Sequence, residues 1–251
     1  MIMLTDEELL RYSRQIMLPE LDIAGQEKLR NASVLIVGLG GLGSPVAMYL
    51  AAAGVGKLVL VDHDQVDLSN LQRQISHTTD RIGVDKVTSA ATAIEQLNPG
   101  CQVDTVNAKL TEQNANGLVS ACDVILDCSD NFAVRFLLNR MSVAHRKPLV
   151  SGAAIRLDGQ VSVYDPRDSH SPCYRCLFDE TGEEDLRCSS NGVLAPLVGI
   201  VGSIQATEAI KVITGVGEVL VGRLLIIDAL TMQFRNVKLK PNERCPVCSG
   251  G

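Results

Sequence analysis

The sequence predicts an α/β protein built on a Rossmann-like, doubly wound and mainly parallel sheet. Three apolar runs, residues 33–37, 57–61 and 123–126, each have the length of a buried strand. The first run continues into the glycine-rich loop Gly38-Leu-Gly-Gly-Leu-Gly43, and the second ends at Asp62. A strand, a glycine-rich turn, a helix and a second strand that ends in an acid are typical of a nucleotide-binding βαβ unit.

Apolar periodicity places strands and helices alternately as far as about residue 150. The expected elements are, in order, helices 6–17 and 24–31, strand 33–38, helix 43–53, strand 57–62, helix 84–97, strand 101–107, helix 111–119, strand 123–127, helix 131–145 and strand 147–151. Beyond them, residues 160–164, 223–228 and 234–239 have the pattern of antiparallel strands. Residues 165–195 are polar and loop-like, and a tightly packed helix is expected to begin near Pro196.

We expect one domain over residues 1–251, because a chain of 251 residues with 46% hydrophobic content can bury one substantial core. It would comprise a helical segment over 1–32, a nucleotide-binding part over 33–151 and a β and cysteine-rich part over 152–251. The net charge of −6 argues against a nucleic-acid partner. The N-terminus lacks the features of a signal peptide, and the uncharged stretch 192–207 is too short to span a bilayer, so a cytoplasmic protein without a membrane partner is expected.

Each part of the glycine-rich loop has a role in the nucleotide-binding interpretation. Gly38 would allow the tight turn off the strand, and Gly40 and Gly41 would let backbone N–H groups approach a phosphate. Gly43 would let the following helix pack against the strand, and Asp62 would bind a ribose hydroxyl. An ordinary strand-to-helix turn remains the alternative for the loop alone.

Polar residues after Asp62 bear on which nucleotide is bound. Asn70, Arg73 and Lys86 supply hydrogen-bond donors and positive charge that suit a triphosphate better than a dinucleotide. Ser44 follows Gly43 directly, so the loop has no Walker lysine and the positive charge must come from elsewhere. A solvated charged loop is the alternative for each of these residues taken singly.

The third apolar run ends in two carboxylates, Asp127 and Asp130. Asp130 would lie at the carboxyl end of its strand, where ligands bind in open parallel sheets, and a carboxylate there is suited to hold Mg²⁺ against nucleotide phosphates. Either acid would alternatively cap the helix that follows.

Four of the eight cysteines form two Cys-x-x-Cys pairs, Cys173 with Cys176 and Cys245 with Cys248. Four thiolates close a tetrahedral site, so one structural Zn²⁺ is expected, with disulfides or redox pairs as alternatives. Cys101, Cys122 and Cys128 are expected to be buried small hydrophobes. The four histidines share no ligand spacing and receive no role.

Several motifs in one order resemble the MoeB/ThiF-type (E1-like) adenylyltransferases of ubiquitin-like sulphur carriers. They are Arg11-Tyr-Ser-Arg-Gln15, the glycine-rich loop, Ser69-Asn-Leu-Gln-Arg-Gln74, Asp127-Cys-Ser-Asp-Asn131 and the two cysteine pairs. The resemblance covers residues 6 to 248. It implies ATP-dependent adenylation of the C-terminal glycine of a small carrier protein ending in Gly-Gly, with Mg²⁺ and release of pyrophosphate.

The resemblance also assigns residues. The nucleotide-binding set it implies is Gly41, Asp62, Ser69, Asn70, Leu71, Gln72, Arg73, Lys86, Asp130 and Asn131, with Asp130 on magnesium. Arg14 would reach into the site of a partner subunit, which makes a homodimer. Cys188 would form a covalent intermediate with the carrier or be a plain loop cysteine. The catalytic residues implied are therefore Arg14, Arg73, Lys86, Asp130 and Cys188, and residues 152–251 would bind the carrier.

Residues 150–156 and 228–235 look more like the molybdopterin-synthase branch of this family than like the thiamin branch. A thiamin-pathway carrier remains an alternative substrate. The resemblance includes no rhodanese-like extension, so a separate sulphur donor is expected. A nucleotide-binding interaction protein without chemistry is the alternative from another class, but it would not need Arg73, Lys86 and Asp130 together.

Overall fold

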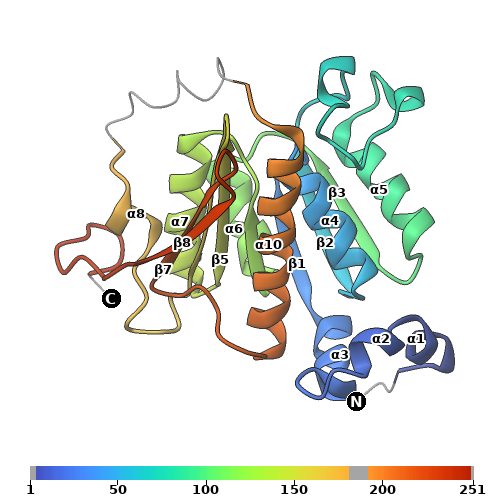
Figure 1. Ribbon diagram of the computed structural model, residues 1–251, viewed down its shortest axis with the longest axis horizontal. Helices are drawn as coiled ribbons and strands as arrows, with labels where there is room; N and C mark the ends of the chain where they lie inside the picture. Colours follow the sequence, from blue (N-terminus) through green and yellow to red (C-terminus); the bar gives the residue numbers. More distant parts are fainter. Residues whose placement is uncertain (1–3, 181–191, 250–251) are drawn as a thin grey trace.

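The computed structural model describes residues 4–180 and 192–249, and its centre is one eight-stranded sheet with the order β3-β2-β1-β4-β5-β6-β7-β8 (Figure 1). Strands β1 to β5 pair in parallel, and β6 to β8 continue the sheet antiparallel. The strands are β1 (Ser33–Val37), β2 (Lys57–Asp62), β3 (Gln102–Asn107), β4 (Val124–Asp127), β5 (Leu149–Ile155), β6 (Asp158–Tyr164), β7 (Arg223–Asp228) and β8 (Gln233–Lys238). The predicted fold class, a parallel core followed by an antiparallel extension, is confirmed.

The helices that flank this sheet also follow the predicted order. They are α1 (Asp6–Arg11), α2 (Ser13–Ile16), α3 (Asp22–Asn31), α4 (Gly43–Ala52), α5 (Lys86–Leu97), α6 (Glu112–Ser120), α7 (Phe132–His145), α8 (Tyr174–Leu177) and α10 (Ala195–Thr214), with short 3₁₀ turns η1 (Leu68–Asn70) and η2 (Thr79–Arg81). The single helix expected over 6–17 is interrupted at Tyr12, whose backbone leaves helical geometry. Tyr12 is buried and its hydroxyl accepts a hydrogen bond from Asn98, so a tertiary contact accompanies the break.

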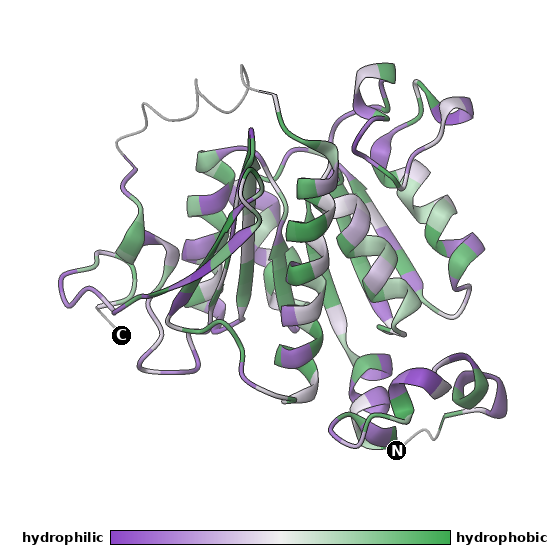
Figure 2. Ribbon diagram, viewed as in Figure 1, coloured by the Kyte–Doolittle hydropathy of each residue, from purple (hydrophilic) through white to green (hydrophobic). Residues whose placement is uncertain are grey.

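Alternate residues of each central strand contribute to two separate cores, as the period of two requires. Val34 and Ile36 of β1 pack with α4, α5 and α10, whereas Leu35 and Val37 pack on the other face with α6 and α7. Figure 2 shows hydrophobic residues running along the central strands and the helices packed against them. Both faces of the parallel strands are therefore covered, as expected for this class of sheet.

Helix α10 is a core helix that packs against the parallel strands β4 and β5 and against the antiparallel strand β6. Within residues 4–180 and 192–249 it is the one helix long and apolar enough to cross a membrane, and half of it is buried inside the protein. The helix continues beyond the uncharged stretch 192–207 to Thr214 and includes the charged residues Glu208 and Lys211. A Cβ at Gly202 would lie 2.6 Å from the backbone oxygen of Leu42, which explains the close packing of α10 on α4.

Strand order brings distant loops to one edge of the sheet. The chain passes from β1 to β2 on one side and returns to β4 on the other side of β1, so a topological switch point lies between them. The glycine-rich loop after β1, Asp62 at the end of β2 and the loop after β4 meet at that edge. Open α/β sheets bind ligands at this position.

Candidate active site

A cavity of about 1190 Å³ opens at the switch point. Its lining includes seven of the predicted nucleotide-binding residues: Gly41, Asp62, Asn70, Arg73, Lys86, Asp130 and Asn131. Ser69, Leu71 and Gln72 belong to the same turn as Asn70 and Arg73, but they do not line the cavity. The fold thus gathers residues from five segments around one space large enough for a nucleotide and part of a second substrate.

Close backbone packing explains two glycines of the loop. Gly38 has φ of +90°, in the region that favours glycine, so the chain can turn off β1. A Cβ at Gly43 would lie 1.9 Å from the backbone oxygen of Gly38, which excludes any side chain there. Helix α4 can therefore begin directly beneath the loop and direct its N-terminus toward the cavity edge.

Asp62 is held by backbone N–H groups on both carboxylate oxygens. Oδ2 accepts a hydrogen bond of 2.7 Å from Leu39 N, and Oδ1 accepts one of 2.9 Å from Asp64 N. The carboxylate is nearly buried at the end of β2 and faces the cavity. Asp62 therefore joins the end of β2 to the glycine-rich loop, at the place where the sequence predicts the ribose contact.

Lys86 begins α5 and is buried, with Nζ 2.9 Å from Asp64 Oδ2. Burial would raise the pKa of Asp64, but the hydrogen bond and the charge of Lys86 outweigh it, so the pKa is lower than usual. Asp62, His63 and Asp64 bring potential metal-ligating atoms within 4.8 Å of one another. Backbone N–H groups engage Asp62 and Lys86 engages Asp64, so both carboxylates already have partners.

The turn that presents Asn70 and Arg73 is stabilised by its own polar residues. Asp67 caps η1 and accepts hydrogen bonds from the backbone and the hydroxyl of Ser69, which hold the pKa of Asp67 below its usual value. Arg73 Nη1 donates to the backbone oxygen of Ser69 over 3.1 Å. Ser69 therefore orders the turn from outside the cavity, while Asn70 and Arg73 line it.

The loop after β4 separates a structural acid from an exposed one. Asp127 is fully buried and accepts hydrogen bonds from Ser129 and Ser151, whereas Asp130 is exposed and lines the cavity. Asn131 is the N-cap of α7, because its Oδ1 accepts from Val134 N over 3.1 Å. The alternative that Asp127 or Asp130 caps this helix was wrong.

Sequence reasoning missed Arg135, a buried cation that also lines the cavity. Its Nη2 donates to the backbone oxygen of Ser129 over 2.8 Å, and its guanidinium lies 5.5 Å from the centre of the Phe132 ring. The available signal was its place one helical turn after the N-cap Asn131. Arg135 Nε also lies 3.9 Å from the buried Asp127 Oδ2. With Arg73, Lys86 and Lys109, Arg135 is one of four lysine and arginine side chains among the described residues that line the cavity, where the exposed Asp130 is suited to hold a metal.

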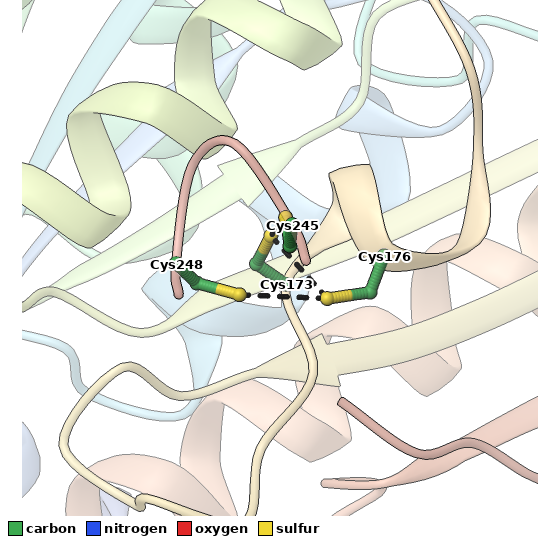
Figure 3. A group of neighbouring side chains, drawn as sticks. All are labelled: Cys173, Cys176, Cys245 and Cys248. Atoms are coloured by element: carbon green, nitrogen blue, oxygen red, sulfur yellow. Dashed lines mark hydrogen bonds between the residues drawn. The ribbon is translucent and has the colours of Figure 1, made fainter. Parts of the chain in front are cut away.

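The two cysteine pairs form one cluster, which joins the segment at α8 to the C-terminal tail (Figure 3). Neighbouring sulphur atoms lie 3.4 Å apart for Cys176 and Cys248, 3.5 Å for Cys173 and Cys245, and 3.9 Å for Cys173 and Cys176. Four thiolates around Zn²⁺ would have sulphur atoms roughly 3.8 Å apart, given a zinc–sulphur distance of about 2.3 Å. The donor set and its spacing therefore fit a closed tetrahedral zinc site.

Groups around the cluster shift the pKa values of its thiols in both directions. Burial would raise the pKa of Cys245, but hydrogen bonds from the backbone N–H groups of Val247 and Cys248 lower it to about 7. Burial raises the pKa of Cys173 to about 11, and burial with the neighbouring thiols raises that of Cys248. Asn242 N donates to Cys176 Sγ, and Asn139 Nδ2 donates to Cys173 Sγ. Such outer contacts orient metal ligands. The other predicted thiols, Cys101, Cys122 and Cys128, are buried elsewhere, as expected.

Arg14 is a further predicted site residue that does not line the cavity. It is exposed on α2 and lines a separate depression of about 270 Å³, together with Tyr49 of α4 and residues of α10. Cys188 lies outside the described residues.

A doubly wound sheet, a cavity at its switch point lined by both basic and acidic side chains and a four-cysteine cluster define an α/β protein of the nucleotide-binding type with a candidate structural-metal module. The chain belongs to the ThiF family, whose profile matches residues 12–247. The resemblance that the sequence motifs predicted is thereby confirmed.

Similar proteins cover nearly the whole chain. The molybdopterin-synthase adenylyltransferase of Escherichia coli K12 is 50% identical over 245 residues, which are 98% of each chain. The adenylyltransferase and sulfurtransferase MOCS3 of Drosophila willistoni is 48% identical over 250 residues, and the match covers 98% of this chain but 54% of that protein. The chain thus spans about half the length of the MOCS3 relatives.

Solved structures share the fold. Escherichia coli MccB with ATP superposes with a TM-score of 0.84 at 24% identity, over 95% of this chain and 74% of that one. At this identity the likeness concerns the fold alone.

Proposed function

We propose that this protein adenylates the C-terminal glycine of a small ubiquitin-like sulphur carrier, of the kind that forms the small subunit of molybdopterin synthase. The observation that carries the proposal is the cavity in which Asp62, the basic side chains of Arg73 and Lys86 and the exposed carboxylate of Asp130 converge. The 50% identity with the Escherichia coli molybdopterin-synthase adenylyltransferase supports the choice of reaction and carrier.

In this reaction a carboxylate oxygen of the carrier attacks the α-phosphorus of ATP. A bond forms between this carboxylate oxygen and the α-phosphorus. The bond between the α-phosphorus and the oxygen that bridges it to the β-phosphate breaks, and pyrophosphate leaves with that electron pair. No proton must be transferred in the step. The difficulty is charge, because one anion attacks another and a third departs, so fixed positive groups lower the barrier.

The residues around the cavity have different roles in this reaction. Asp62 binds the ribose, and N–H groups of the glycine-rich loop, with Lys86, Arg73 and Asn70, hold the phosphates. Magnesium, bound through Asp130, would supply positive charge for the phosphate oxygens. Arg135 adds a buried cation beneath the loop that carries Asp130.

The part of the cavity beyond the nucleotide-binding residues is lined by small and larger residues together. Ala153, Ala154, Gly159 and Gly192 lie in its lining beside Ile155, Gln160 and Ile226. The small residues leave room for a peptide tail without side chains, as in a carrier that ends in Gly-Gly. Residues 152–251 would therefore bind the carrier and direct its tail toward the α-phosphate.

Arg14 completes the site in a homodimer. It is exposed and lies away from the cavity of its own chain, so it would act only on the cavity of a second copy. An arginine supplied in this way would add positive charge to the transferring phosphate. The four cysteines hold one structural zinc in each chain, and the enzyme works in the cytoplasm.

Sulphur transfer to the carrier follows adenylation and uses a separate sulphur donor. The MOCS3 relatives are named for both activities, and this chain spans about half of their length. Cys188 either attacks the acyl adenylate or remains a bystander. A Cys188→Ser variant distinguishes these cases, since adenylation precedes the attack: carrier-dependent exchange persists in both, while thiocarboxylate formation with a sulphur donor fails only in the first.

Carrier-dependent exchange of labelled pyrophosphate into ATP tests the proposal. We expect exchange with a molybdopterin-type carrier and none when its last glycine is removed. Exchange only with a thiamin-type carrier would overturn the choice of carrier but keep the reaction. ATP binding without exchange in the presence of either carrier would identify a non-catalytic nucleotide-binding protein instead.

A further inference from the structure

We propose that His77 is a positioning residue of the glycine-rich loop, where it orients the Leu39–Gly40 peptide so that the N–H of Gly40 faces the nucleotide. The proposal rests on the proposed use of ATP. His77 does not line the cavity, so it acts through the loop and not on the nucleotide itself.

Both nitrogens of the His77 ring have partners, although the side chain is almost fully buried. Nε2 lies 3.0 Å from the backbone oxygen of Leu39, and Nδ1 lies 2.9 Å from Ser89 Oγ on α5. A carbonyl oxygen accepts hydrogen bonds only, so Nε2 must carry the proton. In the neutral ring the Ser89 hydroxyl then donates to Nδ1, which fixes the tautomer.

Leu39 is consequently held at both of its backbone groups. Its N–H donates to Asp62 Oδ2 over 2.7 Å, and its carbonyl accepts from His77. Ser44 Oγ also donates to this carbonyl, but over 3.4 Å, which makes a weaker contact. His77 therefore provides the main restraint on the orientation of the peptide between Leu39 and Gly40.

Orientation of this peptide decides where the next N–H points. The described residues contain no cis peptide, and in a trans peptide the C=O and the N–H point in opposite directions. Because the Leu39 carbonyl points into the protein at His77, the Gly40 N–H points the other way, and Gly40 lines the cavity. Among the described residues no acceptor pairs with this N–H, which leaves it available to a phosphate oxygen.

A matched pair of variants separates the hydrogen bond from simple packing. Glutamine places an amide nitrogen near the position of Nε2, whereas asparagine reaches only the position of Nδ1. We expect His77→Gln to bind Mg-ATP within about threefold of wild type, and His77→Asn to bind it at least about tenfold more weakly, the scale of one hydrogen bond to a charged group. The KM for the carrier should be unchanged in both.

ATP affinity is measured by equilibrium dialysis without carrier, so the result is readable even if wild type shows no carrier-dependent exchange. Wild-type affinity in His77→Asn, or equal losses in both variants, would overturn the proposal.

A second measurement does not depend on the variants folding. In wild-type protein labelled with ¹⁵N in histidine, NMR should identify His77 as the neutral tautomer protonated at Nε2 at about pH 7.5. A neutral ring protonated at Nδ1 would contradict the proposed donation to Leu39.

Discussion

Lys86 and Asp64 form an ion pair at the edge of the cavity, with Nζ and Oδ2 2.9 Å apart and very different exposure of the two side chains. The side chain of Lys86 is 7% exposed and that of Asp64 is 53% exposed. A buried cation is thus paired with a carboxylate whose side chain can rotate toward the solvent. In the proposed function, phosphate oxygens of the nucleotide would take the place of this carboxylate beside Lys86.

Replacing Asp64 with Asn should therefore change stability and ligand response in opposite directions. Without nucleotide the variant should melt at a lower temperature than wild type, because the buried charge of Lys86 loses its partner. With Mg-ATP the increase in Tm should be larger than in wild type, since the phosphates restore the missing negative charge. Thermal unfolding with and without Mg-ATP measures both effects.

Asp104→Asn is the control, because Asp104 pairs with Lys57 on the outer strands and away from the cavity. Its increase in Tm on adding Mg-ATP should equal that of wild type. If Mg-ATP raises the Tm of Asp64→Asn by no more than that of wild type, phosphate does not replace the Asp64 carboxylate beside Lys86.

Asp130→Ala should reduce adenylation by at least about a hundredfold, the scale for removing a group that stabilises charge in the transition state. The carboxylate is exposed, so its loss should not change Tm or the zinc content. Pyrophosphate exchange gives the activity, with Asp168→Ala as a control in an exposed loop outside the cavity. Exchange at the wild-type rate would show that Asp130 does not hold the metal.

Cys245→Ala should release zinc and lower Tm, because the metal contributes folding free energy and joins the C-terminal tail to the segment at α8. Cys101→Ala is the matched control: it removes a buried thiol outside the cluster and should retain zinc. Metal analysis of dialysed protein and thermal unfolding measure the two effects. Zinc retained at one ion per chain in Cys245→Ala would exclude this ligand set.

Regular elements were predictable where local pattern and tertiary structure agree. Strands Lys57–Asp62 and Arg223–Asp228 have the expected bounds, because each is a short run of apolar residues between a basic residue and an aspartate. The break at Tyr12 and the short helix Tyr174–Leu177 were not predicted. Both depend on distant partners, Asn98 for Tyr12 and the C-terminal cysteines for α8, which local periodicity does not contain.

In the candidate site, too, residues in local motifs could be predicted from the sequence, and residues defined by distant contacts could not. Asp62, Arg73 and Lys86 could be selected because they belong to contiguous motifs or carry charges that a phosphate site needs. His77 received no role from the sequence, because its contact with Leu39 spans 38 positions and involves a backbone oxygen. Asp64 was overlooked for a similar reason, since its partner Lys86 lies 22 positions away. Such contacts are created only when the sheet assembles.

The environment of His77 also predicts how stability depends on pH. Burial lowers the pKa of the imidazole, and the positive charges of Lys86 and Arg81 act in the same direction. The hydrogen bond with Leu39 and the negative charge of Asp62 oppose the shift without cancelling it. In the unfolded chain the imidazole has its ordinary pKa, so on acidification the unfolded state binds this proton before the folded state does.

Folding stability should consequently fall as the pH drops through the ordinary histidine range, and this loss should end once the folded state is also protonated. His77→Gln has no group that titrates there, so it should lose less stability than wild type between about pH 7.5 and about pH 5.5. Urea unfolding at both pH values gives the free energies, and the difference between the two proteins removes the contribution of the other histidines, His63, His145 and His170, which they share. An equal loss in both proteins would mean that His77 takes up its proton as readily in the folded state as in the unfolded chain, against the buried neutral ring that the contacts with Leu39 and Ser89 require.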